Sequence, residues 1–182
     1  MYVAAMVELK TRQKGCGLFV LRTEVIEEWI LLGPFTGTLR RTSEVKENQK
    51  EFTLEASPDG SWSLFAPKKN CVLSIINEPS ENEQANCSLV AFAVTDATGV
   101  AVEEGDDKYM LWVVTCEKVI GPKELTMLYN NKNYKRDYKT GDPPLRAPPN
   151  AADMYRLIKT YCEHTHVSYK ELVNEYGAQE EH

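Results

Sequence analysis

The sequence predicts a mainly β fold, a β-rich α+β domain with a short helical extension at its C-terminal end, from two observations. Residues 14–128 contain many short apolar runs that end at turn signals, without regular alternation between strands and helices. Near the C-terminus, two segments with helical spacing follow a proline-rich stretch. A chain of 182 residues with 42% apolar and 26% charged residues fits one ordinary domain with a small appendage.

The expected strands are short and end at recognisable turns. The pair Gly33-Pro34 is a strong breaker at the end of one run. Residues 57–61 predict a hairpin, because the proline in this segment presets φ and the glycine accepts a positive φ. Residues 40–50 are polar and indicate a surface loop. The apolar runs expected to form strands are residues 16–21, 29–32, 35–39, 52–55, 62–65, 87–95 and 109–116.

The C-terminal third has a different character. Two Pro-Pro pairs between residues 142 and 149 predict a stiff, extended connector. A helix should begin near Asn150, and a second one at Ser168, where Glu171 completes a capping-box pattern. We therefore expect a domain of residues 1–141, and a connector with a helical extension of residues 142–182. The apolar face of the first helix would be Met154, Leu157, Ile158, Tyr161 and Cys162.

The charge balance limits the classes of partner. The chain has 21 Lys and Arg against 27 Asp and Glu, a formal net charge of −6. This balance argues against nucleic-acid binding, which needs a surplus of cations, and suits a basic protein or peptide. No apolar run approaches membrane-spanning length, and Glu8 comes too early for a signal-peptide core. We expect a soluble intracellular protein, nuclear or cytoplasmic, with no membrane partner.

The cysteines give no indication of a metal site. There are five of them, widely spaced and without a Cys-x-x-Cys pair, so they do not supply the paired thiolates of a zinc cluster. The strongest candidate is Cys162-x-His164-x-His166, but alternate residues of a helix do not share a face. We expect no bound metal.

Three segments that lie far apart in the sequence carry chemical information. Residues 14–19 place two glycines around Cys16, where the backbone can approach a ligand closely. Residues 75–87 put two asparagines soon after a buried apolar run, and residues 119–129 close a short apolar strand with Tyr129. Each segment alone also fits a plainer structure: a tight turn, a pair of loop asparagines and a packed tyrosine.

Taken together and in this order, the segments resemble the SET domain of protein-lysine methyltransferases, over a core of roughly 115 residues. They resemble the family's Gly-x-Gly strand, aromatic-x-Gly turn, Asn-His-x-x-x-x-Asn motif and Glu-Leu-Thr-x-x-Tyr motif. Parts of the second and third stretches look like the PR-domain branch. Residues 129–141 resemble the Tyr-rich tail that replaces a zinc-binding post-SET segment in some members. The matching stretches are KGCGLFV (14–20), GPFTGTL (33–39), INEPSENEQANCSLVAF (76–92) and GPKELTMLY (121–129).

The sequence also departs from the family's pattern. Glu78 stands where the motif has histidine, and three extra residues separate Asn77 from Asn86. Phe35 replaces the tyrosine of the aromatic-x-Gly turn, and Pro122 replaces a glycine. The cysteine-rich pre-SET and post-SET clusters are absent from the sequence.

The resemblance implies a SET-type fold of several small curved sheets and transfer of a methyl group from S-adenosylmethionine to a lysine amine of a basic protein, such as a histone tail. S-adenosylhomocysteine would be the product. Tyr129 would be the catalytic residue. Phe35 would line the substrate channel and permit higher methylation states; Tyr109 would line the same channel or pack in the core. Tyr134 or Tyr138 would stack on adenine. The cofactor-binding residues would be Lys14, Gly15, Cys16, Gly17, Asn77, Glu78, Tyr134 and Tyr138.

Two other interpretations fit the sequence. The first is a catalytically inactive SET-like module that binds a protein partner, which Glu78, Phe35 and Pro122 suggest. The second is a β-rich binding domain whose motifs match by accident.

Overall fold

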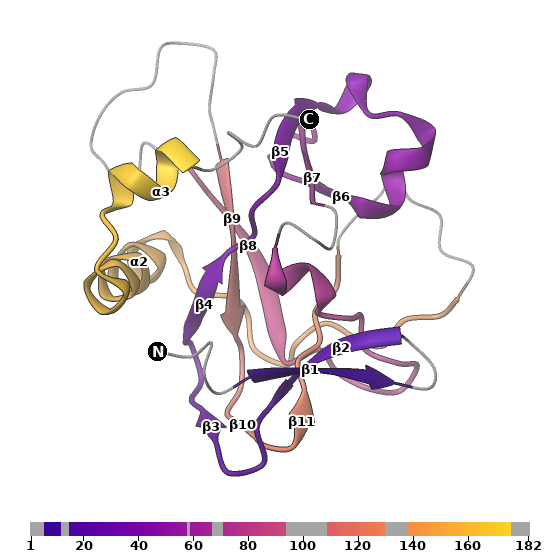
Figure 1. Cartoon of the computed structure of the whole chain (residues 1–182), viewed down its shortest axis with the longest axis vertical. Coiled ribbons are helices and arrows are strands. Elements are labelled where there is room, and N and C mark those ends of the chain that lie inside the picture. The colour runs from indigo at the N-terminus through magenta and orange to yellow at the C-terminus, as the bar shows by residue number, and fades with distance from the viewer. Residues whose placement is uncertain are drawn as a thin grey trace.

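The computed structural model describes residues 6–11, 15–57, 59–66, 71–93, 109–129 and 138–175 (Figure 1). Within these ranges the chain forms short strands, 3-10 turns and two C-terminal helices. The elements are β1 (Met6–Thr11), β2 (Gly15–Val20), β3 (Val25–Ile26), β4 (Leu31–Pro34), β5 (Thr38–Arg41), η2 (Thr42–Glu44), η3 (Glu47–Phe52), β6 (Thr53–Glu55), β7 (Trp62–Phe65), η4 (Val72–Ile75), β8 (Cys87–Ala93), β9 (Tyr109–Thr115), β10 (Val119–Ile120), β11 (Lys123–Glu124), α2 (Ala151–Thr165) and α3 (Tyr169–Glu175).

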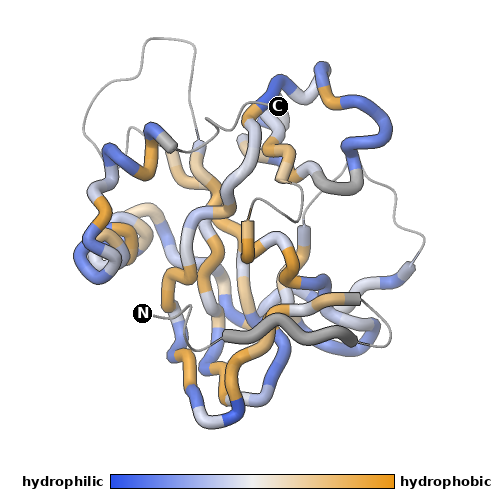
Figure 2. The backbone as a smooth tube through the Cα atoms, in the orientation of Figure 1, coloured by the Kyte–Doolittle hydropathy of each residue, from blue (hydrophilic) through white to orange (hydrophobic). Residues whose placement is uncertain are grey.

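The strands pair into four small sheets, so the predicted fold class is confirmed. Their strand orders are β1-β2-β11, β3-β10, β4-β9-β8 and β5-β7-β6, and every pair within them is antiparallel. Figure 1 shows the β4-β9-β8 sheet in the middle of the molecule, with α2 and α3 on one side, the β1-β2-β11 and β5-β7-β6 sheets toward the other side, and β3 and β10 at the bottom. Figure 2 shows apolar residues along the central strands and a largely hydrophilic segment over η2 and η3.

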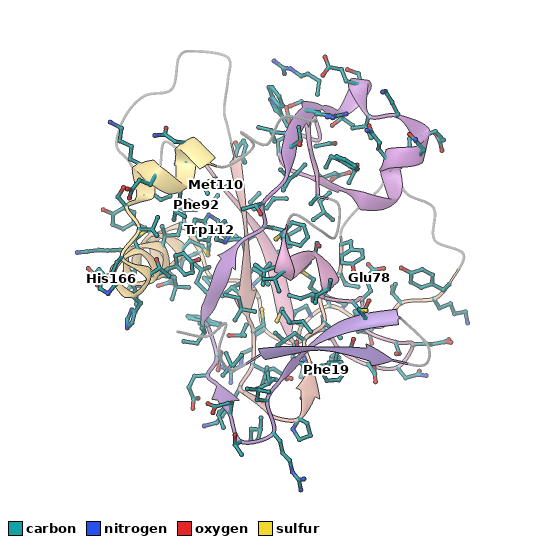
Figure 3. All side chains as sticks on the ribbon, viewed as in Figure 1. Phe19, Glu78, Phe92, Met110, Trp112 and His166 are labelled. Carbon is teal, nitrogen blue, oxygen red and sulfur yellow. The ribbon has the colours of Figure 1, made fainter. Side chains whose placement is uncertain are left out.

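Strand β9 contributes buried side chains to two hydrophobic cores, one on each face of the central sheet. Because successive side chains of a strand point to opposite faces, its buried residues divide into two sets. Leu111 and Val113 belong to the core that contains β2, η4 and the residues around β11. Met110, Trp112 and Val114 belong to the core beneath the helices, where Figure 3 also shows Phe92. The central sheet therefore connects the helical extension to the remaining sheets.

The two helices begin where their capping signals predict. The Asn150 side chain accepts a hydrogen bond from the backbone N–H of Asp153 at 3.0 Å. Ser168 and Glu171 form a reciprocal capping box, with bonds of 2.7 and 3.2 Å. The helix α2 buries Met154 and Ile158 against the central sheet. No helix in the described ranges is long and apolar enough to cross a membrane.

Two local features differ from what the sequence led us to expect. Residues 6–11, which were not among the expected strands, form β1 and pair with β2 along their whole length. The segment 40–50, expected as a loop, begins with the end of β5 and continues into two 3-10 turns.

The expected hairpin is present between β6 and β7, with Gly60 at φ 72°.

The described cysteines lie mostly in the core. Burial raises the pKa of the Cys87 and Cys116 thiols, which keeps both groups protonated and unreactive. No cluster of three or more potential metal ligands occurs in the described part of the chain.

The packing of α2 can be tested with Ile158→Ala, because the Ile158 side chain of this helix is 2% exposed and lies in the core between α2 and the central sheet. We expect a loss of about 2–4 kcal/mol in the free energy of unfolding, measured in urea, from lost burial and the cavity that remains. The adjacent variant Lys159→Ala, at an exposed position of the same helix, should change stability by about 0.5 kcal/mol or less. Equal effects of the two substitutions would contradict the observed packing.

Candidate active site

The three segments singled out in the sequence lie side by side in the structure. The backbone N–H of Leu125 bonds to the carbonyl of Leu18 at 2.8 Å, which joins the chain after β11 to β2. Asn77 and Thr126 form a parallel bridge, and Met127 donates its N–H to the Asn77 carbonyl at 3.0 Å. These backbone bonds assemble one local structure from parts of the chain that are far apart in sequence.

The Asn77 amide occupies the junction of these segments. Its Nδ2 donates to the Cys16 carbonyl at 3.0 Å and to Glu124 Oε1 at 2.8 Å. Both partners can only accept, so the orientation of the amide is fixed and Oδ1 is the acceptor. Oδ1 receives no hydrogen bond from the residues the structure describes. A Cβ at Gly17 would overlap Glu124 Oε1 and lie 3.0 Å from Asn77 Nδ2, so a side chain there would displace the Glu124 carboxylate from its bond to Asn77.

The buried side chain of Asn86 holds the neighbouring backbone of residues 124–126 in place. It is 1% exposed, and its Oδ1 accepts from the Thr126 N–H at 2.9 Å while its Nδ2 donates to the Glu124 carbonyl at 2.7 Å. The side chain therefore supplies a partner to the buried Thr126 N–H and to the partly buried Glu124 carbonyl. Asn86 does not line the cavity described below, so its contribution is to hold residues 124–126 in place.

Glu78 links Tyr129 to the chain around Tyr138. The Glu78 side chain accepts from the Tyr129 N–H at Oε1 and from the Tyr138 hydroxyl at Oε2, both at 3.0 Å. The Tyr129 hydroxyl donates to the carbonyl of Ile76 at 2.5 Å. Tyr129 is thus held at both its backbone and its hydroxyl, and its ring orientation is well defined.

Residues 138–142 cross the loop that follows Asn77. Thr140 bridges Ser80, and Gly141 donates its N–H to the Pro79 carbonyl at 2.9 Å. A Cβ at Gly141 would overlap the carbonyl oxygens of Ser80 and Glu83, so this crossing also depends on glycine.

A cavity of about 440 Å³ lies where these groups meet. Its charged lining consists of two carboxylates and one ammonium group, with Lys139 Nζ 3.0 Å from Glu81 Oε1. The lining residues are Asn77, Glu78, Pro79, Ser80, Glu81, Tyr129, Tyr138 and Lys139.

No family model and no curated protein sequence matches the chain. Solved structures do match. The SET domain of ATXR5, in complex with a methylated histone H3, aligns with a TM-score of 0.56 at 14% identity over 75% of this chain and 61% of that chain. The chain has a SET-type fold. A second ATXR5 complex with methylated histone H3.1 gives a TM-score of 0.54 at 15% identity, over 75% of this chain and 60% of that one.

KRYPTONITE has the same SET-type fold in a larger chain. Its complex with DNA, an H3(1–15) peptide and SAH aligns with a TM-score of 0.53 at 16% identity. The alignment covers 74% of this chain and 26% of KRYPTONITE. This protein thus spans about 60% of the ATXR5 chains and about a quarter of KRYPTONITE.

The cavity of the SET-type fold contains four of the residues singled out in the sequence: Asn77, Glu78, Tyr129 and Tyr138. Cys16 and Gly17 are joined to it through the Asn77 amide, and Gly15 begins β2. Lys14 and Tyr134 lie outside the described residues. Phe35 and Tyr109 do not line this cavity. Phe35 is 3% exposed in the main core, and Tyr109 begins β9 opposite Ala93.

Sequence reasoning missed several groups of the site. Glu124 stands within a recognised motif, but nothing in the sequence indicates that its carboxylate accepts from Asn77. The Ile76 carbonyl is a backbone group, so no side-chain signal could identify it. Ser80, Glu81 and Lys139 enter the lining because the crossing of residues 138–142 brings them there.

The contribution of the two Asn86 hydrogen bonds to stability can be tested with Asn86→Ala. The substitution removes the partner of the buried Thr126 N–H and that of the partly buried Glu124 carbonyl, so we expect a loss of about 2–4 kcal/mol in the free energy of unfolding in urea. The exposed neighbour Gln84, replaced by alanine, should change stability by about 0.5 kcal/mol or less. A near-neutral Asn86→Ala variant would show that the two bonds do not stabilise the junction.

Proposed function

We propose that this protein is an S-adenosylmethionine-dependent protein methyltransferase that acts on a lysine of a basic protein. The observation that carries the proposal is that Asn77 and Tyr129 line the same cavity within a SET-type fold. In this proposal residues 1–141 form the catalytic domain, and the helices after the proline-rich connector form an extension.

The residues of the cavity fit the proposed methyl donor. A volume of about 440 Å³ lies within the range of roughly 300–1,000 Å³ of ligand pockets. The Asn77 Oδ1 suits the ammonium group of the donor's amino-acid part. The backbone of residues 15–17 suits its carboxylate, and the Tyr138 ring, which is 51% exposed, offers a stacking surface for adenine. When bound, S-adenosylmethionine supplies an electrophilic methyl group on a sulfonium ion.

The protein must deliver an uncharged lysine amine to this methyl group. A free lysine has a pKa of about 10.4, so almost none is nucleophilic at neutral pH. A water-poor channel disfavours the ammonium form and lowers that pKa. The hydroxyl oxygen of Tyr129, whose proton is directed at the Ile76 carbonyl, orients the amine and stabilises the polarised methyl group. Tyr129 does not act as a strong base in this scheme.

The proposed substrate class follows from charge and from the neighbours of the fold. A net charge of −6 favours encounter with a basic peptide. ATXR5 was solved with histone H3, and KRYPTONITE with an H3(1–15) peptide and SAH. A histone tail is therefore the first substrate to test, and it would place the protein on chromatin in the nucleus. KRYPTONITE was also solved with DNA, but the acidic balance of this chain argues against DNA as a partner.

The catalytic role is tested with Tyr129→Phe. Using radiolabelled S-adenosylmethionine and mixed histones, we expect roughly 100-fold slower methyl transfer, because one preorganised polar group near the reacting atoms is lost. The dissociation constant of S-adenosylmethionine should change little. Full activity of Tyr129→Phe would contradict the assignment.

A matched control is Tyr155→Phe, which removes the same hydroxyl from an exposed position on α2 and should leave the rate unchanged. Tight binding of S-adenosylmethionine by the wild-type protein without transfer to any protein pool would support the alternative, an inactive SET-like interaction module.

A further inference from the structure

The side-chain amide of Asn77 leaves one hydrogen-bonding atom, Oδ1, for a ligand in the cavity. Asn77 lines the cavity next to Glu78, which Figure 3 labels beside the η4 turn. Its Nδ2 donates to the Cys16 carbonyl and to Glu124 Oε1, so both N–H groups of the amide are used. An amide oxygen can only accept, and no described residue donates to this one. A ligand that bonds to Oδ1 must therefore supply a donor, such as an amine or ammonium group.

The Glu124 side chain is the stronger of the two partners that hold this amide. It accepts from Asn77 Nδ2 at 2.8 Å, whereas the Cys16 carbonyl accepts at 3.0 Å. A hydrogen bond to a carboxylate is stronger than one to a carbonyl, and it polarises the amide so that more negative charge lies on Oδ1. Because both N–H directions are occupied, the amide is also restricted in rotation about χ2. Glu124 is not among the described lining residues of the cavity, so its effect on a ligand there passes through Asn77.

We propose that Glu124 is a positioning residue, which orients and polarises the Asn77 amide so that Oδ1 binds the ammonium group of the methyl donor. The inference rests on the proposed function, in which Oδ1 faces the amino-acid part of S-adenosylmethionine. Recognition of the ammonium group then depends on a carboxylate that the ligand does not touch. The adenosine part of the ligand makes no use of this amide, so the effect of Glu124 is specific to the amine.

Calorimetric titration of the full chain with two ligands that differ only in this amine tests the inference without measuring activity. The ligands are S-adenosylhomocysteine and its deamino analogue, in which hydrogen replaces the α-amino group. The wild-type protein should bind S-adenosylhomocysteine more tightly than the analogue. Glu124→Ala should reduce this preference roughly fivefold to tenfold, because Oδ1 loses its orientation and its added charge. Glu124→Gln keeps an oxygen that accepts from Nδ2 but removes the charge, so its preference should lie between those of Glu124→Ala and the wild type.

A double-mutant cycle with Asn77→Ala shows whether Glu124 acts through Asn77. Adding Glu124→Ala to Asn77→Ala should change the affinity for S-adenosylhomocysteine by less than about twofold, because the amide is already absent. The matched control is Glu117→Ala, which removes a carboxylate that is 43% exposed and paired with Lys123, the residue before Glu124. This control should leave the preference for the amine within about twofold of the wild-type value.

The outcomes are distinct. If Glu124→Ala weakens both ligands equally or neither of them, or if its effect adds fully to that of Asn77→Ala, Glu124 has no positioning role and the inference is wrong. If Glu124→Ala does not unfold cooperatively, Glu124→Gln decides, and an unchanged preference for the amine overturns the inference. If the deamino analogue binds too weakly to titrate, the cycle measured with S-adenosylhomocysteine alone decides.

The same titrations separate this inference from the proposed function. A wild-type protein that does not bind S-adenosylhomocysteine would overturn the proposed function and this inference with it. Binding that is insensitive to Glu124, together with methyl transfer, would refute this inference alone. Amine-selective binding that depends on Glu124, without methyl transfer to any protein pool, would refute only the proposed activity.

Discussion

The side-chain amide of Asn77 is the contact on which the geometry of the candidate site depends. It donates to a carbonyl 61 residues earlier in the chain and to a carboxylate 47 residues later. A hydrogen bond to a charged group contributes about 1.5–3 kcal/mol, so the bond to Glu124 is the stronger of the two. The bond to Glu124 is sensitive to position 17, because a Cβ there would overlap Glu124 Oε1. Because the Asn77 amide joins three segments that are far apart in the sequence, its contacts form only when the chain is folded.

The central sheet connects this site to the C-terminal helices. Alternate residues of β9 contribute to the core next to the cavity and to the core beneath α2 and α3. Without the helices, apolar side chains such as Met110, Trp112 and Phe92 would be exposed on one face of this sheet. The helical extension is therefore a packing layer that stabilises β9 from behind, while the opposite face of the same strand supports the core next to the site.

Local chemistry made part of this structure predictable. The caps at Asn150 and Ser168 and the turn at Gly60 involve groups within a few residues of one another, and the structure has them as expected. The strand β1 was not among the expected strands, although Val7 and Leu9 alternate with Glu8 and Lys10 in the pattern typical of a strand. The hydrogen bonds of Glu78 could not be predicted from the sequence, because the Tyr129 donor lies 51 residues away and the Tyr138 donor 60.

Backbone groups explain how such a site tolerates sequence divergence. Asn77 contacts the carbonyl of Cys16, Tyr129 contacts the carbonyl of Ile76, and Asn86 contacts a backbone N–H and a carbonyl. These backbone partners exist whatever side chain occupies the position, so a substitution at Cys16 or Ile76 leaves the acceptor in place. A position whose side chain enters the cavity is different. Glutamate stands at position 78, where the resembled motif has histidine, and accepts from Tyr129 and Tyr138. A substitution at such a position changes the hydrogen bonds of the cavity wall, whereas the backbone partners above are unaffected.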